Sequence, residues 1–484
     1  MNDDVVDSLG ADLRAAGYTV DGVAELLGPD AHAALGRGVW WPALRACDAA
    51  GGPLATLVRL FLLGADESPQ RAAEAFPTAG LAALTADGVL EDTGETVRAI
   101  LDIRPYSDFL VVSDQDAALR SGPLHRDHVL GIGGASISLA RAVVRTPARR
   151  ALDLGTGCGV QALHLDAHCE QIVATDTNER ALALAAATAR LNGMSWDLRH
   201  GSLFEPVAGE RFDLIVSNPP FVVGAGDMDY IYRDSGVAGD GLCRSIVEQV
   251  ADHLNPGGTA HIMANWIVRG DDWRTRVRDW LAGTGLHAWV VQRELADPVS
   301  YVALWLADAG EPTEQAAQRG GAWLDWFAEQ GITGIGMGLI SLRVPAAGER
   351  PEHTCEEILD EPVTGPEVDA FFARRAFLRH TTDEELLAAR LSTAPVLLEE
   401  QSLPGEHGWQ QIGAAVRRPG GPAAVIGVDE VLRALLAGCR GEVPLGALID
   451  LLAAHHGVDA GALAEAALPE IRTAIGRGIL YQAD

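Results

Sequence analysis

The sequence predicts an α/β protein with a seven-stranded, mostly parallel, doubly wound sheet and helical, winged-helix-like N- and C-terminal domains. Apolar runs and helical repeats alternate between residues 120 and 347, which is the pattern of strand–helix–strand units. Helical periodicity dominates the segments on either side of this region. The length of 484 residues corresponds to about three domains of ordinary size.

The boundaries follow from changes in this pattern. Residues 1–119 predict the N-terminal domain, because helices are followed by two short apolar stretches, Thr96–Ile103 and Phe109–Ser113. Residues 348–365 are rich in Pro, Glu and Thr and predict a linker, and residues 366–484 predict the C-terminal domain. The strands expected in the central domain (residues 120–347) are Arg150–Leu154, Gln171–Thr175, Asp197–His200, Phe212–Ser217, Gly258–Ala264, His287–Arg293 and Gly336–Val344.

Composition excludes several classes of protein. Hydrophobic residues make up 48% of the chain, yet no stretch reaches the ~18 uninterrupted apolar residues that span a bilayer. The acidic start, Met1-Asn2-Asp3-Asp4, differs from a secretory signal, so a cytoplasmic location without a membrane partner is expected. Six cysteines occur without a C-x-x-C pair, and no metal is expected.

The formal net charge is −30, and all 37 basic side chains are arginines. A chain without lysine cannot carry out Schiff-base chemistry or use a phosphate-loop lysine. No long stretch is basic, so the overall charge supplies no attraction to nucleic acid or anionic lipid.

The strongest motif is a glycine-rich loop after an apolar strand, Asp153-Leu154-Gly155-Thr156-Gly157-Cys158-Gly159. Glycines allow the backbone to turn tightly and to approach a ligand closely. The spacing differs from the G-x-G-x-x-G of dinucleotide dehydrogenases. Asp153, just before the loop, can hold a cationic α-amino group and would repel a pyrophosphate. This favours S-adenosylmethionine over NAD.

A second strand ends in Asp176, where a carboxylate can accept hydrogen bonds from both hydroxyls of a ribose. Asn178 follows and can lie along an adenine. The alternative interpretation is structural: Asp176 or Thr177 would equally well serve as the N-cap of the helix Glu179–Leu191.

The third motif is Asn218-Pro219-Pro220-Phe221 at the end of another strand. The prolines fix the backbone, so the Asn218 side-chain oxygen and the Pro219 carbonyl can accept both hydrogens of a planar amine. Phe221 offers a face on which a flat amide or base can stack. The alternative is a rigid turn with no chemical role.

Together, Gly155–Gly159, Asp176 and Asn218–Phe221 resemble the class I S-adenosylmethionine-dependent methyltransferases that act on exocyclic or amide nitrogen, the NPPF/Y group. The chain is similar to the "small-domain" enzymes that modify ribosomal RNA guanine, and to relatives that methylate release-factor glutamine or adenine N6. Residues 127–136 resemble the segment that these enzymes lay over the methionine end of the cofactor. The resemblance covers about residues 120–345, and the whole architecture is similar to a long-form methyltransferase of high-GC actinobacteria.

The resemblance implies a Rossmann-like fold and direct methyl transfer in which Asn218, Pro219, Pro220 and Phe221 are the catalytic residues. Ser202 stands where relatives often place an aspartate near the adenine amine. The residues expected to bind S-adenosylmethionine are Gly133, Ser136, Asp153, Gly155, Thr156, Gly157, Gly159, Asp176, Thr177, Asn178, Ser202, Leu203 and Asn218.

The substrate is left open by the sequence. The resemblance implies N-methylation of an rRNA or tRNA base, with nucleic acid binding, or of a translation-factor glutamine. The acidic charge weighs against RNA. Methylation of a small biosynthetic molecule and a non-catalytic, cofactor-binding regulatory protein are the alternatives, and the intact Asn218–Phe221 string argues against the latter. The sequence does not indicate an oligomeric state.

Overall fold

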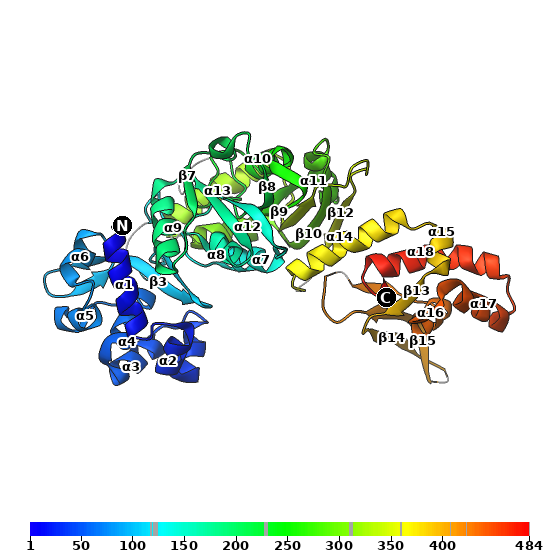
Figure 1. The fold of residues 1–484 in the computed structure, drawn as a ribbon, viewed down its shortest axis with the longest axis horizontal. Helices are drawn as coiled ribbons and strands as arrows, with labels where there is room; N and C mark the ends of the chain where they lie inside the picture. Colours follow the sequence, from blue (N-terminus) through cyan, green and yellow to red (C-terminus); the bar gives the residue numbers. More distant parts are fainter. Residues whose placement is uncertain are drawn as a thin grey trace. The chain divides into compact units, whose positions relative to one another are not determined.

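The computed structural model divides into two compact units, residues 1–140 with 146–355 and residues 141–145 with 356–484 (Figure 1). Residue 120, which begins the predicted central domain, and residues 359–360 of the predicted linker lie outside the described residues. The described residues are 1–116, 119, 124–226, 231–308, 313–358, 361–406, 408–422 and 424–483.

The first unit is built around one eight-stranded sheet in the order β12-β10-β11-β9-β8-β5-β6-β7. Its pairs β5–β6, β6–β7, β5–β8 and β8–β9 are parallel, whereas β11 pairs antiparallel with both β9 and β10. The strands are β5 (Ala148–Leu154), β6 (Cys169–Asp176), β7 (Asp197–His200), β8 (Phe212–Ser217), β9 (Leu254–Val268), β10 (His287–Ala296), β11 (Gly334–Arg343) and β12 (His353–Glu357).

The seven predicted strands are all present as β5 to β11, and the mostly parallel α/β fold is confirmed. The eighth strand, β12, was not predicted and lies in the segment expected to be a linker. It follows Pro351 and its residues are mostly half-buried, so no alternation of apolar and polar residues marks it in the sequence. It adds to the edge of the sheet beside β10.

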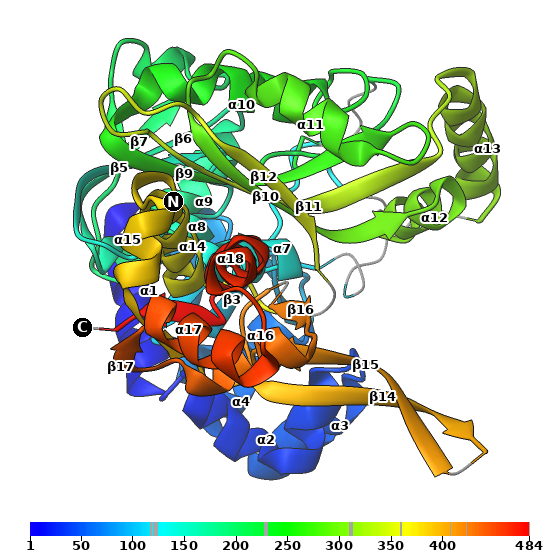
Figure 2. The ribbon, with the colours of Figure 1, turned by 90° about the vertical axis from the view of Figure 1, so that its right-hand side faces the viewer.

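Helices cover both faces of the sheet, and the apolar face of each helix explains its position. Figure 2 shows α10 (Gly241–Gln249) and α11 (Trp273–Leu281) on one side, and α8 (Val160–Asp166) and α9 (Glu179–Leu191) on the other. Ile246 of α10 and Val277 of α11 are fully buried against sheet residues such as Ile215 and Ile262. Strand order reverses at β5, so the carboxyl ends of β5 and β8 form a topological switch point, the place where such folds bind ligands.

The N-terminal part of this unit is helical. It contains α1 (Asp3–Ala15), α2 (Val20–Leu35), α3 (Trp41–Ala50), α4 (Gly52–Leu57) with a π-helical turn over Val58–Leu62, α5 (Pro69–Ala75), α6 (Leu81–Ala86) and the hairpin β1 (Leu90–Asp92)–β2 (Val97–Ala99). A bridge joins Glu67 to Val97, so the order is helix, bridge, helix, helix, hairpin. This hairpin is not the ribbon predicted from Thr96–Ile103 and Phe109–Ser113, because Thr96–Ile103 is divided between β2, which pairs with β1, and β3 (Leu101–Tyr106), which pairs with β4 (Phe109–Asp114). In a winged-helix domain that binds DNA, the helix just before the hairpin enters the groove. Here that helix is α6, and it carries no charged residue that could contact a phosphate.

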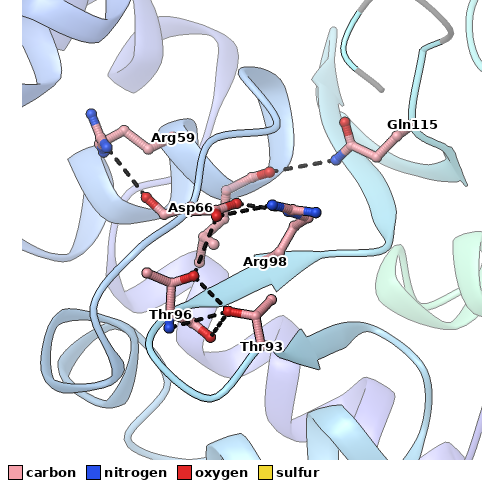
Figure 3. Close-up of polar contacts among 7 residues, drawn as sticks. Arg59, Asp66, Thr93, Thr96, Arg98 and Gln115 are labelled. Carbon is pink, nitrogen blue, oxygen red and sulfur yellow. Dashed lines mark hydrogen bonds and ion pairs between the residues drawn. The ribbon is translucent and has the colours of Figure 1, made fainter. Parts of the chain in front are cut away.

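Asp66 joins the β1–β2 hairpin to the helices (Figure 3). Arg98 donates two hydrogen bonds to its carboxylate, from Nε at 2.7 Å and Nη2 at 2.9 Å, and the Thr96 hydroxyl donates a third at 3.2 Å. Arg59 donates to the Asp66 backbone carbonyl at 3.3 Å. These bonds hold the hairpin in a defined orientation.

A second hairpin, β3 (Leu101–Tyr106)–β4 (Phe109–Asp114), connects the N-terminal helices to the central sheet. The amide of Asn192, just after α9, both accepts from Leu110 N (2.9 Å) and donates to Leu110 O (2.8 Å). The Thr188 hydroxyl on α9 accepts from Val112 N at 3.0 Å. Side chains near the end of α9 thus form hydrogen bonds with the backbone of β4. These bonds attach the N-terminal part of the unit to the central sheet and its helices.

The second unit has its own core, which includes Leu432, Leu435, Ile449, Ile471 and Ile475. Its strand β14 is an edge strand whose residues are all exposed, and it pairs with β15 in a long hairpin. The elements are α14 (Gly365–His380), α15 (Asp383–Ala388), β13 (Arg390–Thr393), β14 (Leu397–Gly405), β15 (Gly408–Arg417), β16 (Val425–Gly427), α16 (Glu430–Gly438), β17 (Arg440–Pro444), α17 (Leu445–His456), α18 (Ala460–Gly476) and β18 (Leu480–Gln482).

Candidate active site

A cavity of about 590 Å³ lies at the carboxyl ends of β5, β6 and β8. It brings together the glycine loop, the segment before β5, the ends of β6 and β7, and the Asn218–Phe221 turn, which are far apart in the sequence. Of the residues predicted to form the site, Asp153 and Gly159 do not line the cavity. Those that do are Gly133, Ser136, Gly155, Thr156, Gly157, Asp176, Thr177, Asn178, Ser202, Leu203, Asn218, Pro219, Pro220 and Phe221.

The three glycines of the loop differ in their roles. Gly155 and Gly157 have φ values of +76° and +56°, and a Cβ on either would meet nothing within 4 Å. They face the open cavity, so a ligand can approach the backbone closely. Gly159 has φ +90°, and a Cβ there would lie 2.6 Å from a ring carbon of Trp196. A glycine is therefore needed at this position to leave room for the Trp196 ring, and not for contact with a ligand.

Asp153 lies beneath the loop and is fully buried. One carboxylate oxygen accepts from the Thr156 hydroxyl (2.6 Å) and from Ala162 N (3.1 Å), which fixes the loop and the start of α8. The other oxygen is buried and has no hydrogen-bond partner. Burial raises the pKa of Asp153 to about 7. An unpartnered carboxylate oxygen of this kind is a place where a positive charge is favoured.

Asp176 ends β6 and faces the cavity. Its carboxylate accepts from Gly157 N and from Asn178 N, both at 2.9 Å, and burial raises its pKa. The N-cap of α9 is Asn178, whose side-chain oxygen accepts from Arg180 N at 3.0 Å. The capping alternative considered for Asp176 or Thr177 is therefore wrong.

Asn218 is fixed in one orientation. Its amide nitrogen donates to the Ser136 hydroxyl oxygen at 3.2 Å, whereas its amide oxygen is buried and has no hydrogen-bond partner. The neighbouring Ser217 hydroxyl donates to Leu154 O at 2.8 Å, which joins the end of β8 to the glycine loop. The unpartnered oxygen of Asn218 is an acceptor available to a donor that enters the cavity.

Asp114 at the end of β4 orients the segment before β5, a role that the sequence did not reveal. It is 6% exposed, accepts from Val129 N at 2.9 Å and pairs with Arg180 of α9. Asn178 donates to Asp127 O at 3.0 Å. His128 and Val129, held between these contacts, line the cavity. No sequence motif indicated this role, because Asp114 and its hydrogen-bond partners lie far apart in the chain.

A second group of unpredicted residues lines the other end of the cavity. Trp305 and Asp308 come from α12 (Pro298–Asp308), and Tyr232 comes from the loop after β8. The Trp305 ring lies edge-on to Phe221, with centroids 6.1 Å apart, and the Tyr232 hydroxyl donates to Asp308 at 2.8 Å. The site therefore has a glycine-lined half and an aromatic half that meet at Asn218.

Within the described ranges, no group of three or more His, Cys, Asp or Glu side chains is placed to hold a metal ion. Among the same residues, no helix is long and apolar enough to cross a membrane.

Three regions of the chain match known protein families, and the central one has a described family. Residues 131–272 match the family "Methyltransferase small domain". The match lies within the central domain. The segments outside this domain match two domains of unknown function, DUF7059 over residues 15–100 and DUF7782 over residues 369–482.

Curated proteins and solved structures are similar to part of this chain. A release factor glutamine methyltransferase of Xylella fastidiosa is 37% identical over 163 residues, covering 30% of this chain and 56% of that protein. A ribosomal RNA small subunit methyltransferase C of Salmonella arizonae is 31% identical over 168 residues, covering 34% and 45%. The YcgJ protein of Bacillus subtilis, a solved structure, is 14% identical with a TM-score of 0.31, covering 44% and 98%. The chain spans about half the length of the curated relatives it matches.

Proposed function

We propose that this chain transfers the methyl group of S-adenosylmethionine to an exocyclic or amide nitrogen of a macromolecule. The observation that carries the proposal is the position of Asn218, which lines the cavity shared with the glycine loop and has a buried amide oxygen without a hydrogen-bond partner. A buried acceptor left without a partner costs about 1–3 kcal/mol, which is recovered when a donor arrives. An amine or amide N–H is such a donor.

The donor set of the glycine-lined half fits S-adenosylmethionine. Gly155 and Gly157 leave open space for close approach, and Asp176 stands where ribose hydroxyls can donate to it. Asp153 does not line this half; its carboxylate accepts from the Thr156 hydroxyl and from Ala162 N, and it therefore holds the loop in shape from below. When bound, this cofactor supplies a methyl group already activated by a sulfonium.

In the mechanism that we propose, Asn218 and Pro219 orient the acceptor. Each of their oxygens would accept one hydrogen of the planar amine, which would direct the nitrogen lone pair toward the glycine-lined half of the cavity. Phe221 packs against the flat acceptor group. Positioning of this kind contributes roughly 7–11 kcal/mol to lowering the barrier in the best cases. The chain need not form a covalent intermediate.

The charge of the cavity favours a protein amide over an RNA base as the acceptor. Of the described lining residues, Asp176, Asp234 and Asp308 are acidic, and the guanidinium of Arg233 is already paired with Asp234 at 3.3 Å. RNA recognition normally requires cations that neutralise phosphates, whereas this chain has a net charge of −30. A glutamine of a translation factor, the kind of substrate named in the Xylella relative, is therefore the acceptor we propose, in the cytoplasm.

The test uses S-adenosylmethionine labelled in its methyl group and a cell extract divided into protein, RNA and small molecules. We expect label in the protein fraction. Label in RNA or in small molecules would overturn the protein substrate, and the absence of label from every fraction would overturn methyl transfer.

Asn218→Ala is the matched variant for this test. We expect turnover to fall at least about 100-fold, as when one positioned hydrogen bond is removed from an active site, with an unchanged dissociation constant for S-adenosylmethionine. Asn255→Ala is the control, because the Asn255 amide donates to Asp213 within the protein and Asn255 does not line the cavity. Loss of cofactor binding with retained turnover in Asn218→Ala would contradict the role assigned to Asn218.

A further inference from the structure

Two helices leave the sheet between β10 and β11 and form an insertion with its own packing. They are α12 (Pro298–Asp308) and α13 (Thr313–Glu329). Tyr301 and Phe327 are at most 1% exposed, and their rings lie 6.3 Å apart. This cluster also contains Val222 and Val223, which follow the Asn218–Phe221 turn. The insertion is therefore a packed element rather than an extended loop.

The insertion holds the backbone directly after the catalytic turn. The Tyr301 hydroxyl accepts from Val223 N at 2.9 Å, and Trp323 donates from Nε1 to Val223 O at 3.0 Å. Tyr301 also accepts from the Asn265 amide of β9 at 2.9 Å, so α12 is tied to the sheet at the same point. Both polar backbone groups of a residue two positions beyond Phe221 are thus held by side chains of the insertion.

The same insertion supplies the wall of the aromatic half of the cavity. Trp305 contacts Phe221 edge-on, and the Arg233 guanidinium donates to Trp305 O at 2.5 Å from beneath. Asp308 stands at the exposed rim of the cavity, where the Tyr232 hydroxyl donates to it. Asp308 retains a second carboxylate oxygen that can accept from an incoming donor.

A smaller hollow of about 170 Å³ adjoins this wall. It shares Val222, Arg233, Asp234 and Ser235 with the larger cavity and is otherwise lined mainly by backbone and small or apolar side chains, Gly224, Ala225, Gly226, Val237, Ala322 and Trp323, together with Arg319. A volume of this size suits one small side chain next to an acceptor residue.

We propose that the α12–α13 insertion is the acceptor-selecting element of this site. The acceptor is an amide side chain in an extended peptide segment. Trp305 and Phe221 form an aromatic wall against which the amide packs, Asp308 accepts from a peptide N–H beside it, and the smaller hollow receives the neighbouring side chain. Trp305 and Asp308 are thus specificity-determining residues. This inference rests on the proposed function and names the form in which the acceptor is presented.

The experiment measures methylation of the protein fraction of a cell extract over a dilution series, with labelled S-adenosylmethionine at saturation. For Trp305→Ala we expect the extract concentration at half-maximal rate to rise about tenfold, as for the loss of an aromatic anchor. The maximal rate and the dissociation constant for S-adenosylmethionine stay within about twofold, because Asn218 and the glycine loop are untouched. Trp305→Phe keeps an aromatic wall and restores most of the affinity for the acceptor.

Asp308→Asn tests the contribution of the cavity rim to binding of the acceptor. We expect the extract concentration at half-maximal rate to rise by only about threefold, because the asparagine side chain still offers one oxygen acceptor. Leu304→Ala and Glu314→Gln are the matched controls: both residues are exposed on the same two helices and do not line either hollow. Wild-type behaviour of Trp305→Ala and Asp308→Asn would overturn this inference alone. Failure of the wild-type protein to label any fraction would overturn the proposed function and this inference together.

Discussion

Asp153 gives the site a measurable pH dependence. Its pKa in the native state is about 7 because the side chain is buried, against an ordinary value of 3.8. Between these two pH values the native state retains a proton that the unfolded chain has released, so the contribution of Asp153 to stability falls as the pH rises. The difference corresponds to on the order of 4 kcal/mol.

We therefore expect the melting temperature of the wild-type protein, relative to Asp153→Asn, to fall from pH 4 to about pH 7 without cofactor and then to level off. The comparison between the two proteins removes the contribution of carboxylates whose pKa is shifted downward, such as Asp66 beside Arg98. A difference that stays constant over this range would mean that Asp153 is ionised throughout.

At the scale of elements, the glycine loop depends on one close contact. Gly159→Ala places a methyl group against Trp196 and keeps the unfavourable positive φ, so we expect a loss of stability of about 3 kcal/mol. Gly193→Ala is the matched control: its φ is +69°, but nothing lies within 4 Å of the added carbon. It should cost only about 1 kcal/mol. Equal melting temperatures for the two variants would show that Trp196 moves aside.

The segment over the cavity depends on Asp114 of β4. Asp114→Asn removes the charge that pairs with Arg180 and weakens the bond from Val129 N, so residues 127–130 lose their anchor. We expect the dissociation constant for S-adenosylmethionine to rise about tenfold, as for the loss of a buried charged partner. Calorimetric titration measures it.

Arg190→Gln is the control for this change. Arg190 lies on the same helix, α9, but pairs with the exposed carboxylates of Asp3 and Asp7, a kind of ion pair that contributes little. An unchanged affinity for S-adenosylmethionine in both variants would show that the β3–β4 hairpin does not contribute to cofactor binding.

The predictable elements were those that bury an apolar pattern. β5, β6 and β8 each contain a short buried and mainly apolar run, and the polar residues near their ends led to the glycine loop, Asp176 and Asn218. β12 is mostly half-buried and β14 fully exposed, so neither carries a pattern that sequence reasoning can detect. Trp305 and Asp308 were missed because their relation to Phe221 exists only after α12 has packed beside the turn, more than 80 residues later in the chain.

At the scale of the whole molecule, the two compact units have separate cores. We expect calorimetry to resolve two unfolding transitions. S-adenosylmethionine at 100 times its dissociation constant should stabilise the first unit by about 2.7 kcal/mol, because the cavity lies wholly within it. Only one transition should then move to higher temperature. A single transition that shifts as a whole would show that the units unfold cooperatively.

The exposed edge strand of the second unit has a consequence for the behaviour of the protein at high concentration. β14 is nine residues long, has no paired strand on one side among the described residues, and exposes Leu397, Leu398 and Leu403 by 41–55%. Free edges of this kind recruit strands from other molecules. Glu399 and Glu400 interrupt the apolar residues and act as gatekeepers against such self-association. Neutralising these two carboxylates would remove that protection, so we expect the variant to self-associate more readily along this edge.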